Sequence, residues 1–125
     1  MKKGMLSALA LAALVTGLLI GVSPSSAGTP AYKHYVGCGL SPHATPSHVC
    51  PKGSKKGAFF TSEQKDVTYS VCVKFPSGKN LCAHKQEAKT GTLYVNKITS
   101  TSVGVHQVTW FVKGKKVGTS VFRVK

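Results

Sequence analysis

Hydrophobic and polar residues alternate strictly from Val67 to Phe75, and this is the clearest pattern in the chain. Valine, tyrosine and phenylalanine occupy every second position, with threonine, serine, cysteine and lysine between them. A period of two with β-branched and aromatic residues is typical of a β-strand that buries one face. We therefore predict a strand over residues 67–75, with Val71 and Val73 in the core.

The segment Pro76-Ser77-Gly78 follows this strand and predicts a three-residue hairpin turn. Proline fixes its own φ angle, and glycine readily takes the left-handed conformation that the bulge after a type I turn requires. If Phe75 faces Lys79, then Cys72 faces Cys82 at a non-hydrogen-bonded pair, where Cα atoms approach to about 4.5 Å. This spacing suits a cross-strand disulfide. The same register places two further residues on the buried face, Leu81 and Ala83.

Three more segments carry β-branched and aromatic residues between glycine-marked turns, and we predict strands over 93–98, 104–112 and 117–124. Trp110 falls on the same strand face as Val108 and Val112, so we expect it in the core. Phe111 then points to the opposite face, as a contact for a partner or as cover for the edge of the sheet. No stretch shows a sustained helical period. Short strands at regular spacing predict an all-β, two-sheet sandwich over residues 58–125.

The first 27 residues have the composition of a secretory signal peptide. Two lysines give a positive start, an apolar run extends from Met5 to Val22, and small residues precede a predicted cleavage after Ala27. An uncleaved membrane anchor is the alternative, because the run is about as long as a short spanning helix. Pro24 and the lack of a basic cluster directly behind the run favour cleavage. We therefore predict a secreted, extracellular protein with no transmembrane segment after cleavage.

Residues 28–57 are rich in Gly, Pro, Ser and Lys without a hydrophobic period, so we predict a loop region ahead of the sandwich. This region holds Cys38 and Cys50, two of the four cysteines. Short exported chains typically use their cysteines in disulfides. Of the three pairings that four cysteines allow, a local Cys38–Cys50 bridge with Cys72–Cys82 fits the spacing and the hairpin register. A zinc site formed by Cys38, His43, His48 and Cys50 is the alternative, but its spacing matches no common zinc motif, and we predict no metal and no other cofactor.

The charge balance is strongly positive, with 17 Lys and Arg residues against three Asp and Glu residues. Lysine predominates, whereas proteins that read specific nucleic-acid sequences rely on the planar guanidinium of arginine, so we expect no sequence-specific nucleic-acid partner. Two lysine-rich turns form a cationic patch if they fall at one end of the sandwich; they contain Lys52, Lys55, Lys56, Lys113, Lys115 and Lys116. Solvated turns are the simpler interpretation of the same residues.

Catalysis is not predicted, because the exported part has only three carboxylates, those of Glu63, Asp66 and Glu87. No two of them have a spacing that indicates acid–base chemistry. No serine lies in a nucleophile-elbow sequence. A histidine at the start of a strand, such as His106, is more often a hydrogen-bonded structural group than a base. We therefore expect a protein that is not an enzyme.

The run from Gly104 to Trp110, followed by a hairpin into Val117-Gly118 and Phe122-Arg123-Val124, resembles the last two strands of bacterial immunoglobulin-like domains. His106 stands where the corner tyrosine of such domains usually stands. The resemblance covers residues 58–125 and implies a small secreted immunoglobulin-like protein, of a kind whose function is mostly unassigned. In antibody-type domains a disulfide joins the two sheets, but here the last long strand has no cysteine. The resemblance therefore implies the sandwich without an antibody-like core.

Two functions fit these observations. The first is a secreted, non-enzymatic module that binds a protein or a cell-surface component through its loops or a sheet face. The second is a cationic effector that binds anionic wall polymers or membranes through its lysines, as an antimicrobial protein does. Its binding would weaken as salt screens the charges. The sequence names no ligand for either.

Overall fold

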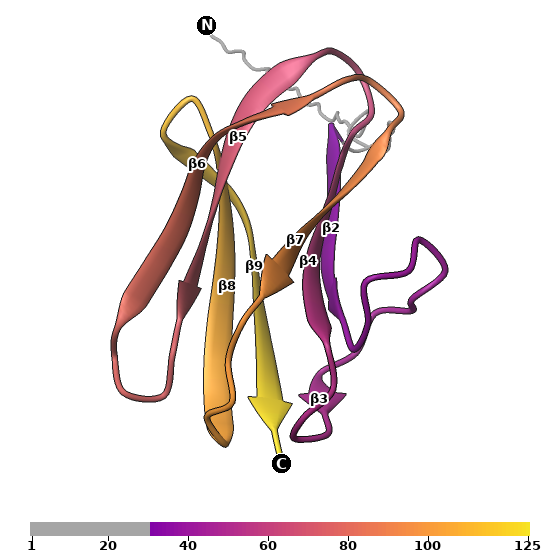
Figure 1. The fold of residues 1–125 in the computed structure, drawn as a ribbon. Coiled ribbons are helices and arrows are strands. Elements are labelled where there is room, and N and C mark those ends of the chain that lie inside the picture. The colour runs from indigo at the N-terminus through magenta and orange to yellow at the C-terminus, as the bar shows by residue number, and fades with distance from the viewer. Residues whose placement is uncertain (1–30) are drawn as a thin grey trace, which may run out of the picture.

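The computed structural model describes residues 31–125, so the predicted signal peptide lies outside the described residues. Over this range the chain forms strands joined by turns and loops, without a helix (Figure 1). In chain order the strands are β2 (Tyr32–Gly37), β3 (Val49–Cys50), β4 (Lys56–Ser62), β5 (Val67–Lys74), β6 (Asn80–Ala88), β7 (Leu93–Ile98), β8 (Gly104–Val112) and β9 (Lys115–Val124).

The strands pack as two facing sheets, one with the order β2-β4-β7 and one with the order β3-β9-β8-β5-β6. Neighbouring strands are antiparallel, except that β3 runs parallel to β9. Figure 1 shows the three-stranded sheet as one layer and the long strands of the five-stranded sheet as the other. The predicted all-β sandwich is confirmed. None of the residues 31–125 belongs to a helix capable of spanning a membrane.

Side chains from both sheets meet in a core built around aromatic rings. Trp110, Phe60 and Phe122 are each at most 1 % exposed. Phe60 of the small sheet stacks on Tyr69 of the large sheet, with ring centroids 4.2 Å apart. Such rings contribute large buried apolar areas and hold the two layers together. Trp110 is buried beside the two residues that the alternation predicted, Val108 and Val112.

The hairpin of β5 and β6 has the register that its turn sequence predicted. Cys72 faces Cys82, and the N–H of Phe75 donates to the carbonyl of Lys79 at 2.8 Å to close the turn. Gly78 takes a φ of 91°, the left-handed conformation that the turn requires. Leu81 is 53 % exposed, so its predicted burial is wrong. The reason is that β6 is the last strand of its sheet, and the opposite sheet has only three strands with which to cover it.

The region predicted as loop, residues 28–57, contains more regular structure than its composition indicated. Strand β2 pairs along its whole length with β4, from Tyr32 opposite Ser62 to Gly37 opposite Gly57. The sandwich therefore begins at β2 and not at residue 58. Composition missed this strand because its stability comes from a partner that is distant in the sequence.

Residues 38–48 do form a loop, and it covers the outer face of the three-stranded sheet. Phe59 lies on that outer face and is nevertheless 0 % exposed, with its ring stacked on Tyr35 at 4.7 Å. A Cβ added at Gly37 would lie 3.1 Å from the Phe59 ring and 3.2 Å from the Cβ of Ala44. Glycine at position 37 thus allows the loop and the ring to approach each other closely.

His34 connects β2 to the five-stranded sheet. Its ring packs on Trp110, with centroids 4.9 Å apart. The ring fills the space next to Gly118, where an added Cβ would lie 2.1 Å from His34 Nε2. Gly118 is the cross-strand partner of Trp110, so the glycine leaves room for the histidine between the sheets.

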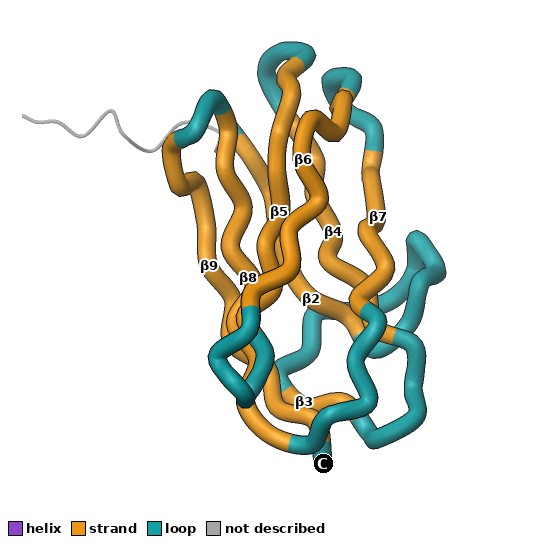
Figure 2. The backbone as a smooth tube through the Cα atoms, turned by 60° about the vertical axis from the view of Figure 1, so that its left-hand side comes forward, coloured by secondary structure: helices purple, strands orange, loops and turns teal. Residues whose placement is uncertain are grey.

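The turns gather at the two ends of the strands (Figure 2). One end holds the turns at 51–55, 75–79 and 99–103 together with the C-terminal Lys125. Two observations place these segments near one another: the N–H of Lys52 donates to the Lys125 carbonyl at 2.8 Å, and Gly104 lies so near Pro76 that an added Cβ would be 3.1 Å from the proline ring. The other end holds the turns at 63–66, 89–92 and 113–114.

Candidate functional site

Both predicted disulfides are present in the structure. Cys38 and Cys50 are joined with Cα atoms 5.4 Å apart, and Cys72 and Cys82 with Cα atoms 4.0 Å apart. The first bond ties the covering loop to the fully buried Cys50 of β3, and the second crosses the β5–β6 hairpin. No cysteine among residues 31–125 is free. Disulfides persist in oxidising compartments, so they indicate an extracellular or periplasmic location.

The two lysine-rich turns lie at opposite ends of the sandwich, so the condition for a joint cationic patch is not met. The 51–55 turn, which contains Lys52 and Lys55, lies at one end of the sandwich, and the 113–116 segment, with its three lysines, lies at the other (Figure 1). Strand β9, which separates them, has 10 residues and spans about 30 Å. Salt screens charges over about 8 Å under physiological conditions, so the two turns act independently. The β8–β9 hairpin sets their separation, because its turn at 113–114 lies at the opposite end of the sandwich from the 51–55 turn.

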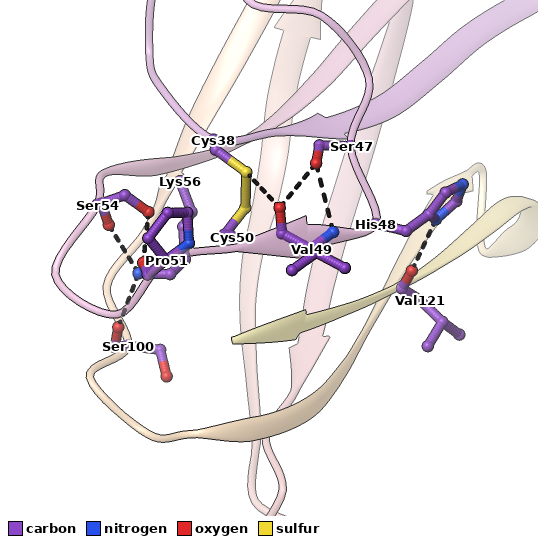
Figure 3. Close-up of a disulfide and its surroundings, with 10 residues drawn as sticks. All are labelled: Cys38, Ser47, His48, Val49, Cys50, Pro51, Ser54, Lys56, Ser100 and Val121. Atoms are coloured by element: carbon purple, nitrogen blue, oxygen red, sulfur yellow. Dashed lines mark hydrogen bonds between the residues drawn. A yellow bond between two sulfur atoms is a disulfide. The ribbon is translucent and has the colours of Figure 1, made fainter. Parts of the chain in front are cut away.

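Lys56 departs further from the prediction, because its side chain is not part of the solvated surface. The residue is only 2 % exposed and opens strand β4. Figure 3 shows its ammonium group between two backbone carbonyls, donating to Ser54 at 2.7 Å and to Ser100 at 3.2 Å. Lys56 therefore ties the 51–55 turn to the 99–103 turn.

All three side-chain carboxylates of the described chain lie at one end of the sandwich. Glu63 pairs with Lys33 at 3.3 Å, and Asp66 lies 3.9 Å from Lys89. Asp66 also accepts hydrogen bonds from the backbone N–H and the hydroxyl of Thr90, both at 2.8 Å, and these bonds lower the pKa of its carboxyl. Glu87 lies near the end of β6, beside the same group of turns.

The opposite end has cationic side chains and no acidic side chain among the described residues, and we call it the acid-free end. It comprises the turns at 51–55, 75–79 and 99–103 with the strand ends next to them. Its basic residues are Lys52, Lys55, Lys56, Lys74, Lys79, Lys97, Arg123 and Lys125. All of them except Lys56 are exposed. Such a surplus of cationic side chains attracts anions.

Phe111 lies on the outer face of the five-stranded sheet, as predicted, and is half-buried there. Its cross-strand partners are Ser70 on β5 and Lys116 on β9. The same face carries the row Thr119, Thr109, Cys72 and Cys82 across four strands. This face is mostly uncharged, and it offers short polar and apolar side chains on a regular sheet.

His106 is completely buried and is held by two hydrogen bonds. Its Nδ1 donates to the carbonyl of Gly104 at 3.1 Å, and its Nε2 lies 2.8 Å from the hydroxyl of Ser100. Phe122 stacks on one side of the ring at 4.8 Å, and Phe75 meets it edge-on at 5.7 Å. A serine–histidine pair resembles part of a catalytic dyad. Here no carboxylate faces the ring, and the pair closes the 99–103 turn over the core.

The alternative zinc site is not formed. Cys38 and Cys50 are joined to each other, and the Nδ1 of His48 donates to the Val121 carbonyl at 3.0 Å (Figure 3). His43 is exposed at the tip of the covering loop. Within residues 31–125 no group of three or more His, Cys, Asp or Glu side chains is placed to hold a metal ion.

A polar bridge spans the open side of the sandwich, between the edge strands β6 and β7. The hydroxyl of Tyr69 donates to Asn96 Oδ1 at 2.7 Å, and Asn96 Nδ2 donates to Gln86 Oε1 at 3.1 Å. Burial of the phenol, helped by the nearby Tyr94, raises the pKa of Tyr69 to about 12. Below the bridge an apolar cleft of about 260 Å³ opens between Leu81, Val73 and Ile98.

Sequence reasoning missed the acid-free end as a unit. Lys74, Lys79 and Lys97 were not singled out, although each lies at or next to the end of a predicted strand. The positions of the three acidic residues carried a signal, since Glu63 and Asp66 precede β5 and Glu87 lies near the end of β6, the strand that runs back beside β5. Reading that signal required the sheet order, and the sheet order depends on contacts between distant segments.

Comparisons with known proteins support the fold. No protein-family model matches the chain, and no curated protein matches it. The structure is similar to an immunoglobulin-like protein from Pseudomonas aeruginosa, with a TM-score of 0.55 and 13 % identity over 74 % of this chain and 92 % of that one. A second similarity, to the Pseudomonas fluorescens alkylpurine DNA glycosylase AlkC, has a TM-score of 0.47 with 15 % identity and covers 76 % of this chain and 30 % of that enzyme. The first of these, together with the sheet order, identifies the fold of this chain as an immunoglobulin-like β-sandwich.

Proposed function

We propose that this protein is an exported, non-enzymatic binding module whose acid-free end contacts an anionic polymer at a cell surface. The observation that carries the proposal is the segregation of charge. Every side-chain carboxylate of the described chain lies at one end, whereas the charged side chains at the other end are all cationic. The cationic side chains of the acid-free end therefore have no acidic side chain of the described chain beside them.

The acid-free end can bind a polyanion as a unit, because its turns are in contact with one another. The Lys52–Lys125 backbone hydrogen bond and the hydrogen bonds of Lys56 to two of the turns keep its segments together. Lysines are compact point charges on flexible stems, which suits contacts to a polymer of variable conformation better than recognition of one fixed geometry. A polyanion with charges a few ångströms apart can therefore neutralise several of these lysines at once.

The disulfides support the predicted export, since exported domains rely on such bonds in oxidising compartments. Immunoglobulin-like folds carry many unrelated functions, so the fold alone names no ligand. The buried, carboxylate-free environment of His106 supports a structural role for this residue and, with it, a non-enzymatic protein.

The proposal is tested with the purified, disulfide-bonded protein and fluorescently labelled long-chain polyphosphate as the polyanion. Binding is measured at a series of salt concentrations for the wild type and two triple variants of equal net charge. One variant changes Lys55, Lys79 and Lys97 at the acid-free end to glutamine. The matched control changes Lys113, Lys115 and Lys116 at the opposite end to glutamine.

We expect the acid-free-end variant to bind polyphosphate at least tenfold more weakly and the control variant to lose less than threefold. The slope of log affinity against log salt should fall by about two for the first variant, because each lost lysine–phosphate contact removes about 0.7 of the slope for a single-stranded polyanion. Equal losses for the two variants would show that only net charge matters and would refute the proposed site.

A further inference from the structure

A cavity on the acid-free end has the features of an anion site. It has a volume of about 360 Å³ and lies between the 51–55 turn and the segment 97–101. Its walls are lined by Ser54, Lys55, Lys56, Lys97, Thr99 and Thr101. Three lysines therefore meet hydroxyl-bearing side chains around one hollow, and no carboxylate contributes to its lining.

Lys56 is the central observation. Its side chain crosses between the two walls, with its Nζ bonded to the carbonyl of Ser54 on one side and of Ser100 on the other (Figure 3). An ammonium group has three N–H donors, and these two carbonyls account for two of them. The ammonium is thus held at the cavity by the backbone of both turns.

Lys56 carries a buried charge that forms no ion pair in the described chain. The residue is 2 % exposed, and the ion pairs of residues 31–125 involve Lys33 and Lys89 at the opposite end. Backbone carbonyls satisfy donors, but they carry no net charge. A buried ammonium costs several kcal/mol unless it is paired, so a bound anion would stabilise this arrangement.

The second wall of the cavity is itself held in place. The hydroxyl of Ser100 lies 2.8 Å from the buried His106 and also accepts the N–H of Ser102 at 3.2 Å. These bonds fix the 99–103 turn against the core before any ligand arrives. The turn is therefore already ordered when a ligand binds, and this lowers the entropic cost of binding.

We propose that this cavity binds a phosphate group, with the ammonium groups of Lys55, Lys56 and Lys97 around it. A phosphate presents several acceptor oxygens in a tetrahedral arrangement and carries up to two charges, which matches cations and hydroxyl groups that approach from two walls. A single carboxylate would match fewer of these donors. The inference rests on the proposed function, because the cavity opens on the acid-free end, and it assigns that end one specific anchoring point.

The test is a nuclear magnetic resonance titration of the isotope-labelled, disulfide-bonded protein with inorganic phosphate at constant ionic strength. We expect saturable shifts of the amide signals of Gly53, Ser54 and residues 99–101, all with one dissociation constant. Lys97→Gln should weaken this binding at least fivefold. Lys113→Gln, which removes the same charge at the other end, should change it less than twofold.

Lys56→Met tests the buried ammonium directly, and it should abolish the saturable shifts. If this variant does not fold, the comparison of Lys97→Gln with Lys113→Gln decides the question alone. Shifts that grow linearly without saturation would overturn the proposal. So would shifts of equal size at the 113–116 turn, or equal effects of the two single variants.

The source of the phosphate is distinguished by competition. If long-chain polyphosphate displaces inorganic phosphate from the cavity, the site binds phosphate groups of a polymer. If both bind together without competition, the cavity takes free phosphate. The phosphate site alone is refuted if phosphate causes no saturable shifts while the acid-free-end triple variant still binds polyphosphate more weakly than the control variant. The proposed function alone is refuted if the phosphate shifts saturate while both triple variants bind polyphosphate equally.

Discussion

Replacing Gly118 with alanine tests the contact by which β2 is held against the five-stranded sheet. The new Cβ would lie 2.1 Å from Nε2 of His34 and 2.3 Å from its Cε1. Ordinary contact begins at 3.4 Å, so the ring must retreat by about 1.3 Å. Because the ring lies between β9 and Trp110, this movement disturbs the packing of both sheets.

Two effects set the size of the destabilisation. Overpacking a filled site costs about 1–3 kcal/mol. Losing the aromatic contact between His34 and Trp110 costs about 0.5–1.5 kcal/mol. His34 is only half-buried and can swing partly outward, which keeps the total at about 2–3 kcal/mol. For a domain of this size we expect the melting temperature to fall by roughly 10–20 °C.

The measurement is chemical unfolding of the oxidised protein, with Gly39→Ala as the matched control. The nearest atom to an added Cβ at Gly39 is 3.9 Å away, so this substitution should be neutral or stabilise the fold by less than about 1 kcal/mol. In a His34→Ala background the space beside Gly118 is no longer filled by the ring, so Gly118→Ala should then cost less than about 0.5 kcal/mol. The double-mutant cycle should therefore give an interaction energy of about 2 kcal/mol between the two positions. If Gly118→Ala is equally costly with and without the His34 ring, the reasoning is wrong.

Two further predictions concern the disulfides and the buried phenol. The bridges Cys38–Cys50 and Cys72–Cys82 span 12 and 10 positions, so chain entropy gives each about 3 kcal/mol of stabilisation. Replacing the first pair by alanine should nevertheless cost at least about 1 kcal/mol more than replacing the second, because Cys50 is fully buried. Equal unfolding midpoints in urea for the two double variants would contradict this. The pKa of Tyr69 is raised to about 12, so its contribution to stability is present below the ordinary value of 10.0 and is lost as pH rises towards 12. Tyr69→Phe should remove this part of the loss of stability at alkaline pH, measured by unfolding at several pH values. An unchanged dependence of stability on pH would contradict the raised pKa of Tyr69.

Local chemistry made the β5–β6 hairpin predictable from the sequence. The turn needs a residue that tolerates a positive φ, and Gly78 supplies it at a fixed distance from Pro76. Once this turn is placed, the period of two determines which residues face each other, and it pairs Cys72 with Cys82. The burial of Trp110 followed in the same way from alternation along one strand. All of these features depend on residues close together in the chain.

The sequence by itself thus determined the strands with alternating patterns, the hairpin register, both disulfides and the immunoglobulin-like class of the fold. Only the tertiary structure decided that residues 32–37 form a strand, that Leu81 remains exposed and that the two lysine-rich turns lie at opposite ends. It also decided that Lys56 is buried while its neighbour Lys55 is exposed. The physical reason is that these properties depend on which distant segments pack together, and such contacts leave no periodic signal in the segment itself. Charge in particular is a property of residue type, whereas a site is a property of where the folded chain places its charges.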